Sequence, residues 1–291
     1  DPYLISTPAQ FLEIKDNPNK YYRLTADLDM TGYPWTTFTT IGTTSPGFTL
    51  DGDGHIVSNL VITSYQTESS TRRVGMFRTD GAYPVTFKDI VFEDPVLSGA
   101  GASGSGSSFM GLLVAAETGS GVLRFERVGI VNGTLTMTSG SSSASYQYNG
   151  LFLGSGAGSP LYFMNCFATG TIKSTGSSWK MDAGGFAGGC SSDYTTMEDC
   201  YVDVAFVNPT TKGAFFGVSV EPTTYGVSFF NSAQAPYYDT SHTHTVIVPC
   251  SASEMRDEET YEYWDIPSTW GMGTWQMSAL DSPLEGYPAF S

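Results

Sequence analysis

Apolar and polar residues alternate in short segments that return along the chain roughly every 30 to 40 residues. One kind of segment is a glycine followed by two or three apolar residues, and it begins at Gly75, Gly111, Gly150, Gly184 and Gly213. Each is followed by a second segment with apolar residues two positions apart, beginning at Phe87, Phe125, Phe163, Met197 and Phe229. Two strand-like segments per repeat, with no helical pattern between them, predict successive coils of a parallel β-solenoid.

Aligning the second segments places related residues in columns. The first column holds Asp89, Arg127, Asn165, Asp199 and Asn231, and the next holds Ile90, Val128, Cys166, Cys200 and Ser232. Adjacent coils of a β-solenoid lie about 4.8 Å apart, so the side chains of one column stack on each other. We therefore expect the first column to be an Asn/Asp ladder at a corner and the second to face the core.

The stretch FTLDGDGHIVSNLVI, from residue 48, is predicted to be the first full coil. Its Asp-Gly-Asp-Gly run, which begins at Asp51, tolerates the left-handed backbone of a tight corner, and Ile56, Leu60 and Ile62 follow as core positions. His55 is expected to close this turn, because no second His or Cys stands near it at the spacing of metal ligands.

Composition agrees with a β-rich fold that has many turns, since the 291 residues include 33 glycines, 17 tyrosines and 18 phenylalanines. The formal net charge is −16 with only 13 Lys and Arg, which argues against nucleic acid or an anionic membrane as a partner, because both need clustered cations. The sequence contains neither an apolar run long enough to span a bilayer nor the pattern of a signal peptide, so membrane insertion is not expected.

The four cysteines leave the redox environment open. Cys166 and Cys200 fall in one column of neighbouring coils, where either a disulfide or two unbonded core thiols would fit. Cys190 and Cys250 have no partner that the repeat predicts.

The chain resembles a known family, the bacterial and phage surface proteins with GLUG repeats, in which G-L-[FV]-G turns punctuate a right-handed parallel β-helix. The Gly-apolar turns carry the resemblance, together with the entry segments YLISTPAQFLEI and YRLTADLDMTG, the first coil, and the closing segments YWDIPSTWGM and GYPAF. Asp27 and Asp29 fit the family's L-x-x-D-[IL]-D pattern. The turns at Gly75 and Gly111 lack the closing glycine, so these corners are expected to be wider.

We therefore expect one all-β domain, a right-handed parallel β-helix (solenoid) with small N-terminal and C-terminal caps made of helices or strands. Residues 1–37 would form the entry segment and N-terminal cap, in which residues 9–14 fit an amphipathic helix that covers the first coil. Coils would occupy residues 38–234. Residues 235–291 would form the C-terminal cap, with a strand in HTHTVIVPC, a helix in SASEMRDEETYEYW that begins at Ser251 or Ser253, and a Trp-rich remainder.

Polar inserts join each second strand to the next Gly-apolar turn: TSYQTESSTRR, SGAGASGSGSS, TSGSSSASYQY, STGSSWKMDA and NPTTK. All occupy the same place in the repeat, so a solenoid would stack them along one edge as a rim. One interpretation is that they are flexible linkers without a function of their own. The other is that Tyr65, Tyr146, Tyr148 and Trp179, aromatic residues on hydroxyl-rich loops, bind the face of a neutral sugar or a protein epitope.

Catalytic motifs are scarce. The sequence has no G-x-S-x-G elbow, no H-E-x-x-H and no phosphate-binding loop, so these classes of enzyme are not indicated. Glu126 and Glu198 fall in one column two coils apart, about 9.6 Å by stacking distance, which fits the carboxylate pair of an inverting glycosidase. His242 and His244 alternate along a strand but are too few for a metal site. We expect neither a metal nor a cofactor.

The resemblance implies non-enzymatic recognition on the surface of a cell or virus particle, with a cell-surface glycan or protein receptor as the partner. One alternative is an enzyme that cleaves a polysaccharide with Glu126 and Glu198. Another is a structural spacer or decorating fibre that binds another structural chain through an end cap. The family resemblance and the Ser/Thr/Gly-rich inserts favour an extracellular location.

Overall fold

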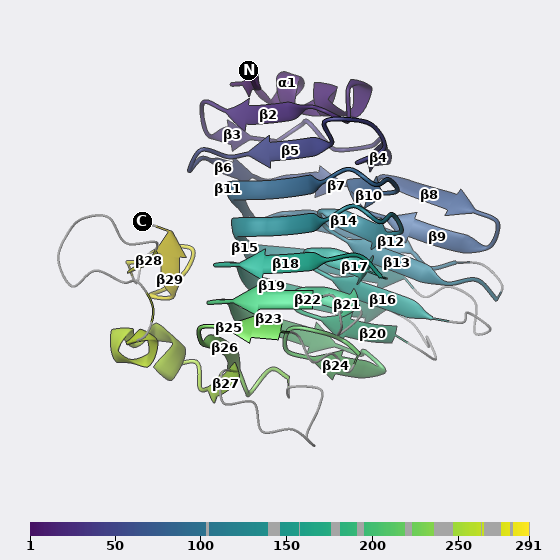
Figure 1. Cartoon of the computed structure of the whole chain (residues 1–291). Coiled ribbons are helices and arrows are strands. Elements are labelled where there is room, and N and C mark those ends of the chain that lie inside the picture. The colour runs from purple at the N-terminus through teal and green to yellow at the C-terminus, as the bar shows by residue number, and fades with distance from the viewer. Residues whose placement is uncertain are drawn as a thin grey trace.

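The computed structural model describes residues 1–102, 105–138, 146–156, 158–175, 181–190, 195–218, 223–235, 247–262, 264, 275–279 and 282–290. The chain winds as a right-handed parallel β-solenoid with few helices, as predicted (Figure 1). No helix among the described residues is long and apolar enough to cross a membrane. The division into an entry segment, coils and a C-terminal cap at residues 37 and 234 stays a prediction.

The strands of successive coils stack into three sheets, and these sheets form the walls of the solenoid. The first contains β1 (Tyr3–Ile5), β2 (Tyr21–Leu24), β5 (Phe48–Asp51), β11 (Val85–Glu93), β15 (Leu123–Thr138), β19 (Phe167–Thr175), β23 (Tyr201–Val207), β26 (Ser228–Asn231) and β27 (Ile247–Cys250). Seven further strands pair alongside these: β3 (Leu28–Asp29), β6 (Ile56–Ser58), β7 (Val61–Ile62), β12 (Val96–Ala100), β18 (Leu161–Met164), β22 (Thr195–Glu198) and β25 (Thr223–Tyr225).

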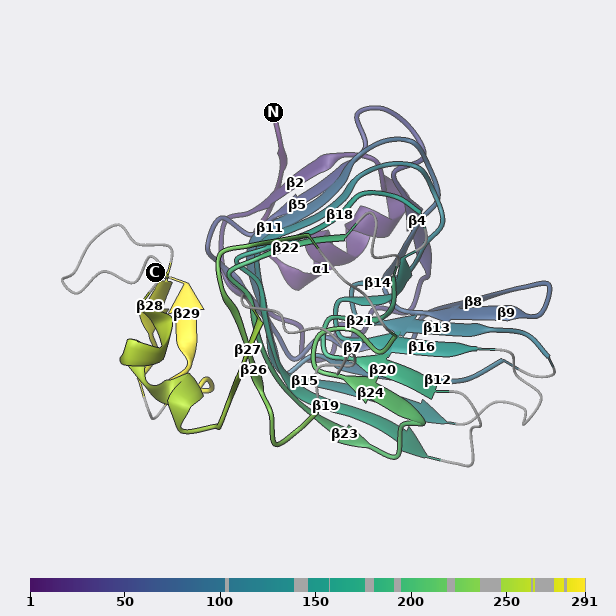
Figure 2. The ribbon, with the colours of Figure 1, turned by 60° about the horizontal axis from the view of Figure 1, so that its bottom comes forward.

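The second and third sheets complete each coil. The second contains β4 (Thr39–Ile41), β10 (Phe77–Thr79), β14 (Val114–Glu117), β17 (Leu153–Gly156) and β21 (Ala187–Gly189). The third contains β8 (Tyr65–Glu68), β9 (Thr71–Val74), β13 (Ser108–Gly111), β16 (Gln147–Gly150), β20 (Met181–Gly184) and β24 (Thr211–Gly213). Figure 2 shows that the third sheet and the ends of β12, β15, β19 and β23 extend together away from the body of the coils.

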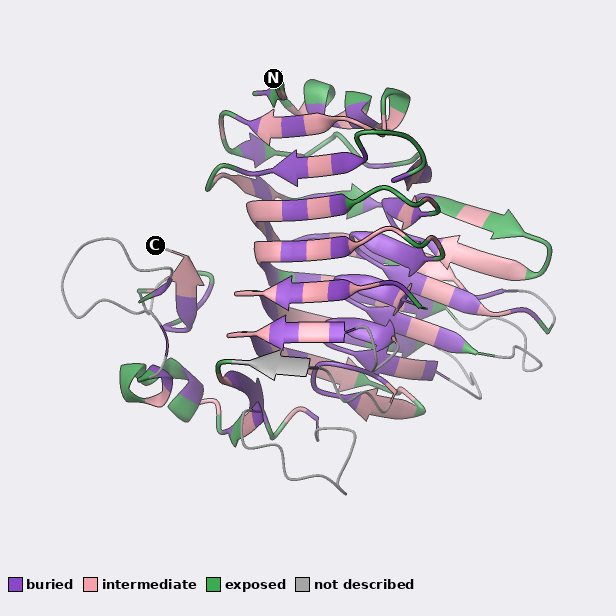
Figure 3. Ribbon diagram, viewed as in Figure 1, coloured by how far each residue is buried: buried purple, intermediate pink, exposed green. Residues whose placement is uncertain are grey.

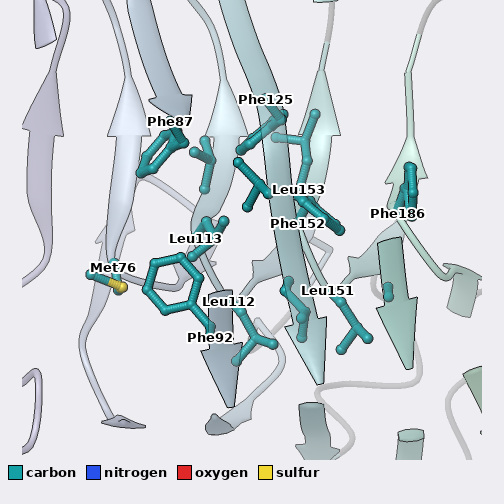
Figure 4. Close-up of a cluster of buried hydrophobic side chains, with 14 of the residues drawn as sticks. Met76, Phe87, Phe92, Leu112, Leu113, Phe125, Leu151, Phe152, Leu153 and Phe186 are labelled. Carbon is teal, nitrogen blue, oxygen red and sulfur yellow. The ribbon is translucent and has the colours of Figure 1, made fainter. Parts of the chain in front are cut away.

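Alternation of apolar and polar residues explains the core. Along β11, β15 and β18 of the first sheet, buried and partly exposed positions alternate over much of each strand (Figure 3). Phe87, Phe125 and Phe163 stack in one inward column, with ring centroids 5.3 and 5.2 Å apart. Phe152 and Phe186, which come from the Gly-apolar turns, fill the interior beside them (Figure 4). The repeated glycine is needed for space, because a Cβ at Gly150 would lie 2.4 Å from the carbonyl oxygen of Leu153.

The predicted corner column is confirmed in four coils. Asp89, Arg127, Asn165 and Asp199 all have left-handed φ angles, between 45° and 54°. Arg127 and Asp89 of adjacent coils bond to each other along this column, whereas Asn165 and Asp199 bond to groups outside it. The Arg127 Nε–H donates to Asp89 Oδ1 at 2.8 Å, and Asp199 Oδ1 accepts from the Val227 amide at 3.0 Å.

The fifth coil has a different register from the predicted one. Phe229 pairs with Tyr201 rather than Met197, which places Asn231 beside Asp203. Asn231 therefore does not belong to the corner column. Four residues of the predicted core column are fully buried, namely Ile90, Val128, Cys166 and Cys200. Ser232 is exposed, and Ser228 takes its place by accepting the Cys200 amide proton at 3.0 Å.

The opening corner is built as expected. Asp53 and Gly54 have φ angles of 51° and 85°, and the His55 Nδ1 lies 3.1 Å from Asp27 Oδ1, which ties the turn to the entry segment. Leu60 and Ile62 are buried. Ile56 is only partly buried, and its neighbour Val57 faces the core instead.

The N-terminal end is covered by α1 (Pro8–Leu12) and the 3₁₀ helix η1 (Glu13–Asp16), close to the helix predicted over residues 9–14. Thr7 caps α1 by accepting the Gln10 amide proton. Phe11 and Ile14 are fully buried, and the Phe11 ring lies edge-on to Trp35, with centroids 5.9 Å apart. The first coil is thereby closed to solvent at this end.

The C-terminal segment contains two 3₁₀ helices, η3 (Glu254–Arg256) and η4 (Glu258–Tyr261), and a separate hairpin of β28 (Trp275–Met277) and β29 (Pro288–Phe290). The prediction of one continuous helix here is wrong. The backbone of Asp257 is extended (φ −101°, ψ 122°), and its carboxylate accepts the Glu259 amide proton to start a second helix. Ser251 caps the first helix as predicted, since its Oγ accepts the Glu254 amide proton at 3.2 Å.

This segment packs against the side of the coils (Figure 2). Phe167 and Tyr201 point outward there with their rings stacked, and Trp275 packs on both. The Tyr201 hydroxyl donates to the Pro288 carbonyl oxygen at 2.8 Å, and the Trp275 Nε1–H donates to Asn165 Oδ1 at 3.1 Å. The described part of the segment thus covers an apolar flank that crosses several coils.

Candidate functional site

Parallel register brings one row of side chains to the outer face of the third sheet. Arg73, Phe109, Tyr148 and Asp182 are aligned on β9, β13, β16 and β20. Their neighbours along each strand are more deeply buried in β13, β16 and β20, because side chains of a strand point alternately to its two faces. The row therefore runs down the stack with one residue from each of four coils.

Three aromatic rings on this face form what we call the aromatic strip, namely Phe109, Tyr146 and Tyr148. The Phe109 and Tyr148 rings are parallel within 6°, with centroids 5.9 Å apart, and the Tyr146 and Tyr148 rings are parallel within 7° at 5.8 Å. Parallel rings at this separation are offset, so each leaves part of its face uncovered. Tyr146 is 49% exposed, and the other two rings are partly buried.

Small residues of the second sheet make room for the strip. Ala116, Ser155 and Gly189 are aligned on β14, β17 and β21, and Arg78 of β10 precedes them in the same row. A Cβ at Gly189 would lie 3.0 Å from Cδ1 of Tyr148, so a larger residue would press on the ring. The strip thus lies in the inner corner between the second and third sheets.

Charged groups stand at both ends of the strip. Arg73 and Arg78 meet at the N-terminal end, where both guanidinium groups contact the carboxylate of Glu68 on the β8–β9 hairpin. Asp182 stands at the other end, next to Tyr148. Burial and, second, the charge of Asp182 raise the pKa of the Tyr148 hydroxyl, so this tyrosine is neutral at physiological pH.

The structure brings together two of the four predicted ligand-binding residues, Tyr146 and Tyr148. Tyr65 lies on the opposite face of the β8–β9 hairpin, paired with Val74, with the Arg72 guanidinium 4.1 Å from its ring centroid. Its insert is an antiparallel hairpin, and the register of a hairpin fixes which face each residue takes. Trp179 lies outside the described residues.

Sequence reasoning missed Phe109. A signal for it exists, because Phe109 precedes Gly111 by two positions in the same way that Tyr148 precedes Gly150. Because a Gly/Ser-rich insert precedes Phe109, its equivalence to Tyr148 was not evident from the sequence.

The two glutamates considered for catalysis do share a column. Glu126 pairs with Met164, and Met164 pairs with Glu198, as expected for residues two coils apart. The Glu126 carboxylate lies 3.6 Å from the Arg124 guanidinium, and both side chains are about two-fifths exposed. Neither glutamate lines either of the cavities described next.

Two cavities lie between the coils and the C-terminal segment. One, of about 330 Å³, is mainly apolar and is lined by Val91, Phe167, Leu284 and Phe290 among others. The other, of about 370 Å³, is polar and is lined by residues that include Asp203, Arg256 and Tyr287. In the second cavity the Tyr287 hydroxyl donates to Asp203, and burial together with this bond raises the pKa of the Tyr287 hydroxyl.

The cysteines are unbonded thiols, and Cys166 and Cys200 are both buried in the core column. Burial and, second, the contact with Cys166 raise the pKa of the Cys200 thiol well above its usual value, which makes the thiol unreactive. The described residues contain no group of three or more His, Cys, Asp or Glu that could hold a metal ion. His242 and His244 lie outside those residues.

Comparison with known proteins identifies the architecture. No model of a known protein family matches the sequence, and no curated protein matches it. Among solved structures, the chain is similar to a protein from Bacteroides ovatus provisionally assigned as an immunoglobulin A1 protease. The two chains are 16% identical, the match covers 100% of this chain and 92% of the other, and the TM-score is 0.59. The likeness is one of fold.

Proposed function

We propose that this chain is a non-enzymatic recognition module on a cell or virion surface, and that it binds a glycan on the aromatic strip. The observation that carries the proposal is the set of parallel, partly uncovered rings of Phe109, Tyr146 and Tyr148. Sugar rings present apolar C–H faces that pack on aromatic rings, while tyrosine hydroxyls supply hydrogen bonds. Two adjacent coils each place one aromatic ring in the same row, Phe109 and Tyr148, which suits two linked sugars.

Two further features support the proposal. The strip lies on a rigid framework, because β13, β16 and β20 are held in parallel register on both sides. A preformed surface loses little conformational entropy on binding. The resemblance to GLUG-repeat surface proteins also supports an extracellular location and a role in attachment.

The enzymatic alternative has weaker support. The Glu126 and Glu198 side chains project from a strand face in the described structure, and the Met164 side chain lies in the column between them. The Bacteroides ovatus protein of similar fold carries a provisional assignment as a protease, but at 16% identity its activity does not transfer to this chain.

A glycan array tests the proposal, read for retained protein and for loss of glycan on the same spots. The double variant Tyr146→Ala/Tyr148→Ala should lose about five- to 150-fold in affinity, since two aromatic contacts of about 0.5–1.5 kcal/mol each are removed. Tyr65→Ala is the control, because it removes an exposed tyrosine from the face of the β8–β9 hairpin that points away from the strip.

Three outcomes would contradict the proposal. Undiminished retention of the double variant, or an equal loss in Tyr65→Ala, would remove the strip from the binding site. Loss of glycan from the spots, abolished by Glu198→Gln, would establish the enzymatic alternative. Absence of retention on every glycan would leave a protein receptor as the partner to test.

A further inference from the structure

Two arginines at the N-terminal end of the aromatic strip have mostly buried side chains. The Arg73 side chain is 12% exposed and the Arg78 side chain is 11% exposed. Their Nη1 atoms lie 3.1 and 2.8 Å from the same carboxylate oxygen, Oε2 of Glu68. Arg78 also contacts Asp80 and donates to Gln66 Oε1 at 3.3 Å. Two guanidinium groups therefore share one carboxylate on the hairpin.

The polar groups of this arginine pair are incompletely satisfied. The Nε–H groups of Arg73 and Arg78 are buried and have no acceptor among the described residues. Burial and, second, the nearby charge of Arg78 lower the pKa of Arg73, whereas Glu68 opposes this effect. Asp80 pairs with Arg78. For Arg73, the carboxylate within reach among the described residues is the shared Glu68, which is 57% exposed and therefore neutralises this cation only in part. A desolvated guanidinium that lacks full compensation gains from a further anion.

The arginine pair is continuous with the aromatic strip. Arg73 lies one strand from Phe109 in parallel register, or about 4.8 Å along the stack, and Arg78 lies in the same row as the small residues beneath the rings. Asp182 is three strands from Arg73, or about 14 Å. A bound chain would therefore meet cations at one end of the strip and a carboxylate at the other.

We propose that Arg73 and Arg78 form a subsite for the acidic group of a glycan, a carboxylate or a sulfate ester, while a neighbouring sugar packs on Phe109 and Tyr148. This inference rests on the proposed function and specifies its ligand class. In the free protein, Glu68 occupies the subsite as an internal carboxylate, and the ligand displaces it toward solvent. The net charge of −16 and Asp182 disfavour a polyanion, so the ligand is a largely neutral glycan with an isolated acidic sugar.

Matched pairs of immobilised oligosaccharides test this inference. Each acidic member is compared with a neutral partner: sialylated with desialylated, uronate with carboxyl-reduced, and sulfated with desulfated, and heparin serves as the polyanion. The wild-type protein should retain one acidic member about tenfold or more better than its neutral partner, since charge-assisted hydrogen bonds have this magnitude. The pair that responds identifies the source of the acidic group.

Three variants separate the subsite from general charge effects. Arg73→Gln should abolish the preference for the acidic member while keeping affinity for the neutral one. Glu68→Gln should strengthen binding of the acidic member several-fold, because the internal competitor is removed. Lys15→Gln is the control, since it removes the same charge at η1 in the N-terminal cap. Thermal unfolding of each variant establishes that it folds.

The outcomes distinguish this inference from the proposed function. Equal retention of the acidic and neutral members, or an unchanged preference in Arg73→Gln, would overturn the subsite and leave the strip as a binder of neutral sugars. Weaker acidic binding by a folded Glu68→Gln, or preferential retention on heparin, would also overturn it. Absence of retention on every glycan would overturn both proposals.

Discussion

Replacing Asp51 by Asn should destabilise the first coil more than its position on the outer face of a strand suggests. Its side chain is only 2% exposed. One oxygen, Oδ2, accepts from the Tyr21 hydroxyl at 2.6 Å and lies 2.9 Å from Lys88 Nζ and 3.1 Å from Arg23 Nη2, whereas Oδ1 accepts the Asp53 amide proton at 3.0 Å. These groups come from three adjacent strands, so this carboxylate joins the entry segment to the first two coils.

The magnitude follows from these contacts. Hydrogen bonds to a charged group contribute about 1.5–3 kcal/mol each. The variant loses part of this stabilisation, but it also no longer has to bury a charged carboxylate, which offsets some of the loss. Arg23 and Lys88 are 37% and 30% exposed, so they regain hydration when the carboxylate is removed. We expect Asp51→Asn to lower the free energy of unfolding at pH 7 by about 2–3 kcal/mol.

The effect should depend on pH. Burial acts to raise the pKa of Asp51, but the hydrogen bonds from Tyr21, Lys88 and the Asp53 amide outweigh it and hold the pKa below its ordinary value. A carboxylate with a lower pKa in the folded state stabilises the fold above its unfolded pKa, about 3.9, and loses this contribution as the pH falls through the folded pKa. The difference between wild type and variant should therefore shrink below pH 3.9.

Urea unfolding at pH 7 and at pH 2 measures both quantities. Asp53→Asn is the matched control, since Asp53 is exposed and its left-handed backbone suits Asn equally well. A loss below about 0.5 kcal/mol at pH 7 would refute the role assigned to the buried carboxylate. A difference that persists unchanged at pH 2 would refute the electrostatic origin.

Substitutions at two further positions test the packing described above. Gly189→Ala should displace the Tyr148 ring and weaken retention on the glycan that the wild type binds, with unfolding changed by less than about 1 kcal/mol; unchanged retention would mean that the ring position does not matter. Cys200→Ala should cost about 1–3 kcal/mol in urea unfolding, because the buried Cys166 amide loses its acceptor at 3.4 Å, whereas Cys200→Ser should cost less. Equal losses would show that the hydrogen bond contributes nothing.

Much of the fold follows from local patterns in the sequence. Alternating apolar residues and the repeated glycine locate most strands, and the residues Asp89 and Asn165 mark corners because Asp and Asn tolerate a left-handed backbone. The predicted register of the fifth coil is wrong for a physical reason. Phe229 and Phe230 are both apolar, so alternation does not decide which of them faces the core, and pairing with Tyr201 and Val202 settles the register.

The candidate site was only partly predictable. Tyr146 and Tyr148 stand two positions apart before a Gly-apolar turn, so the sequence alone places them on one face of a strand. The meeting of Arg73 with Arg78 depends on the sharp corner at Gly75, which turns the chain from the third sheet to the second. The periodicity of the sequence does not tell how sharply the chain turns at Gly75, so the contact between Arg73 and Arg78 could not be predicted without the structure.

The C-terminal segment has a consequence for how the protein unfolds and folds. A stack of coils held only by contacts between neighbours can fray from either end, one coil at a time. Trp275 bonds to Asn165, Pro288 to Tyr201, and the Trp264 indole to the Val227 carbonyl oxygen, so one segment is fastened to three successive coils. Unfolding any of these coils breaks one of the segment's attachments and weakens its hold on the other two, which couples the unfolding of the three coils. Because the fastening residues follow the coils in the sequence, the coils acquire this cooperativity only after the segment has been synthesised.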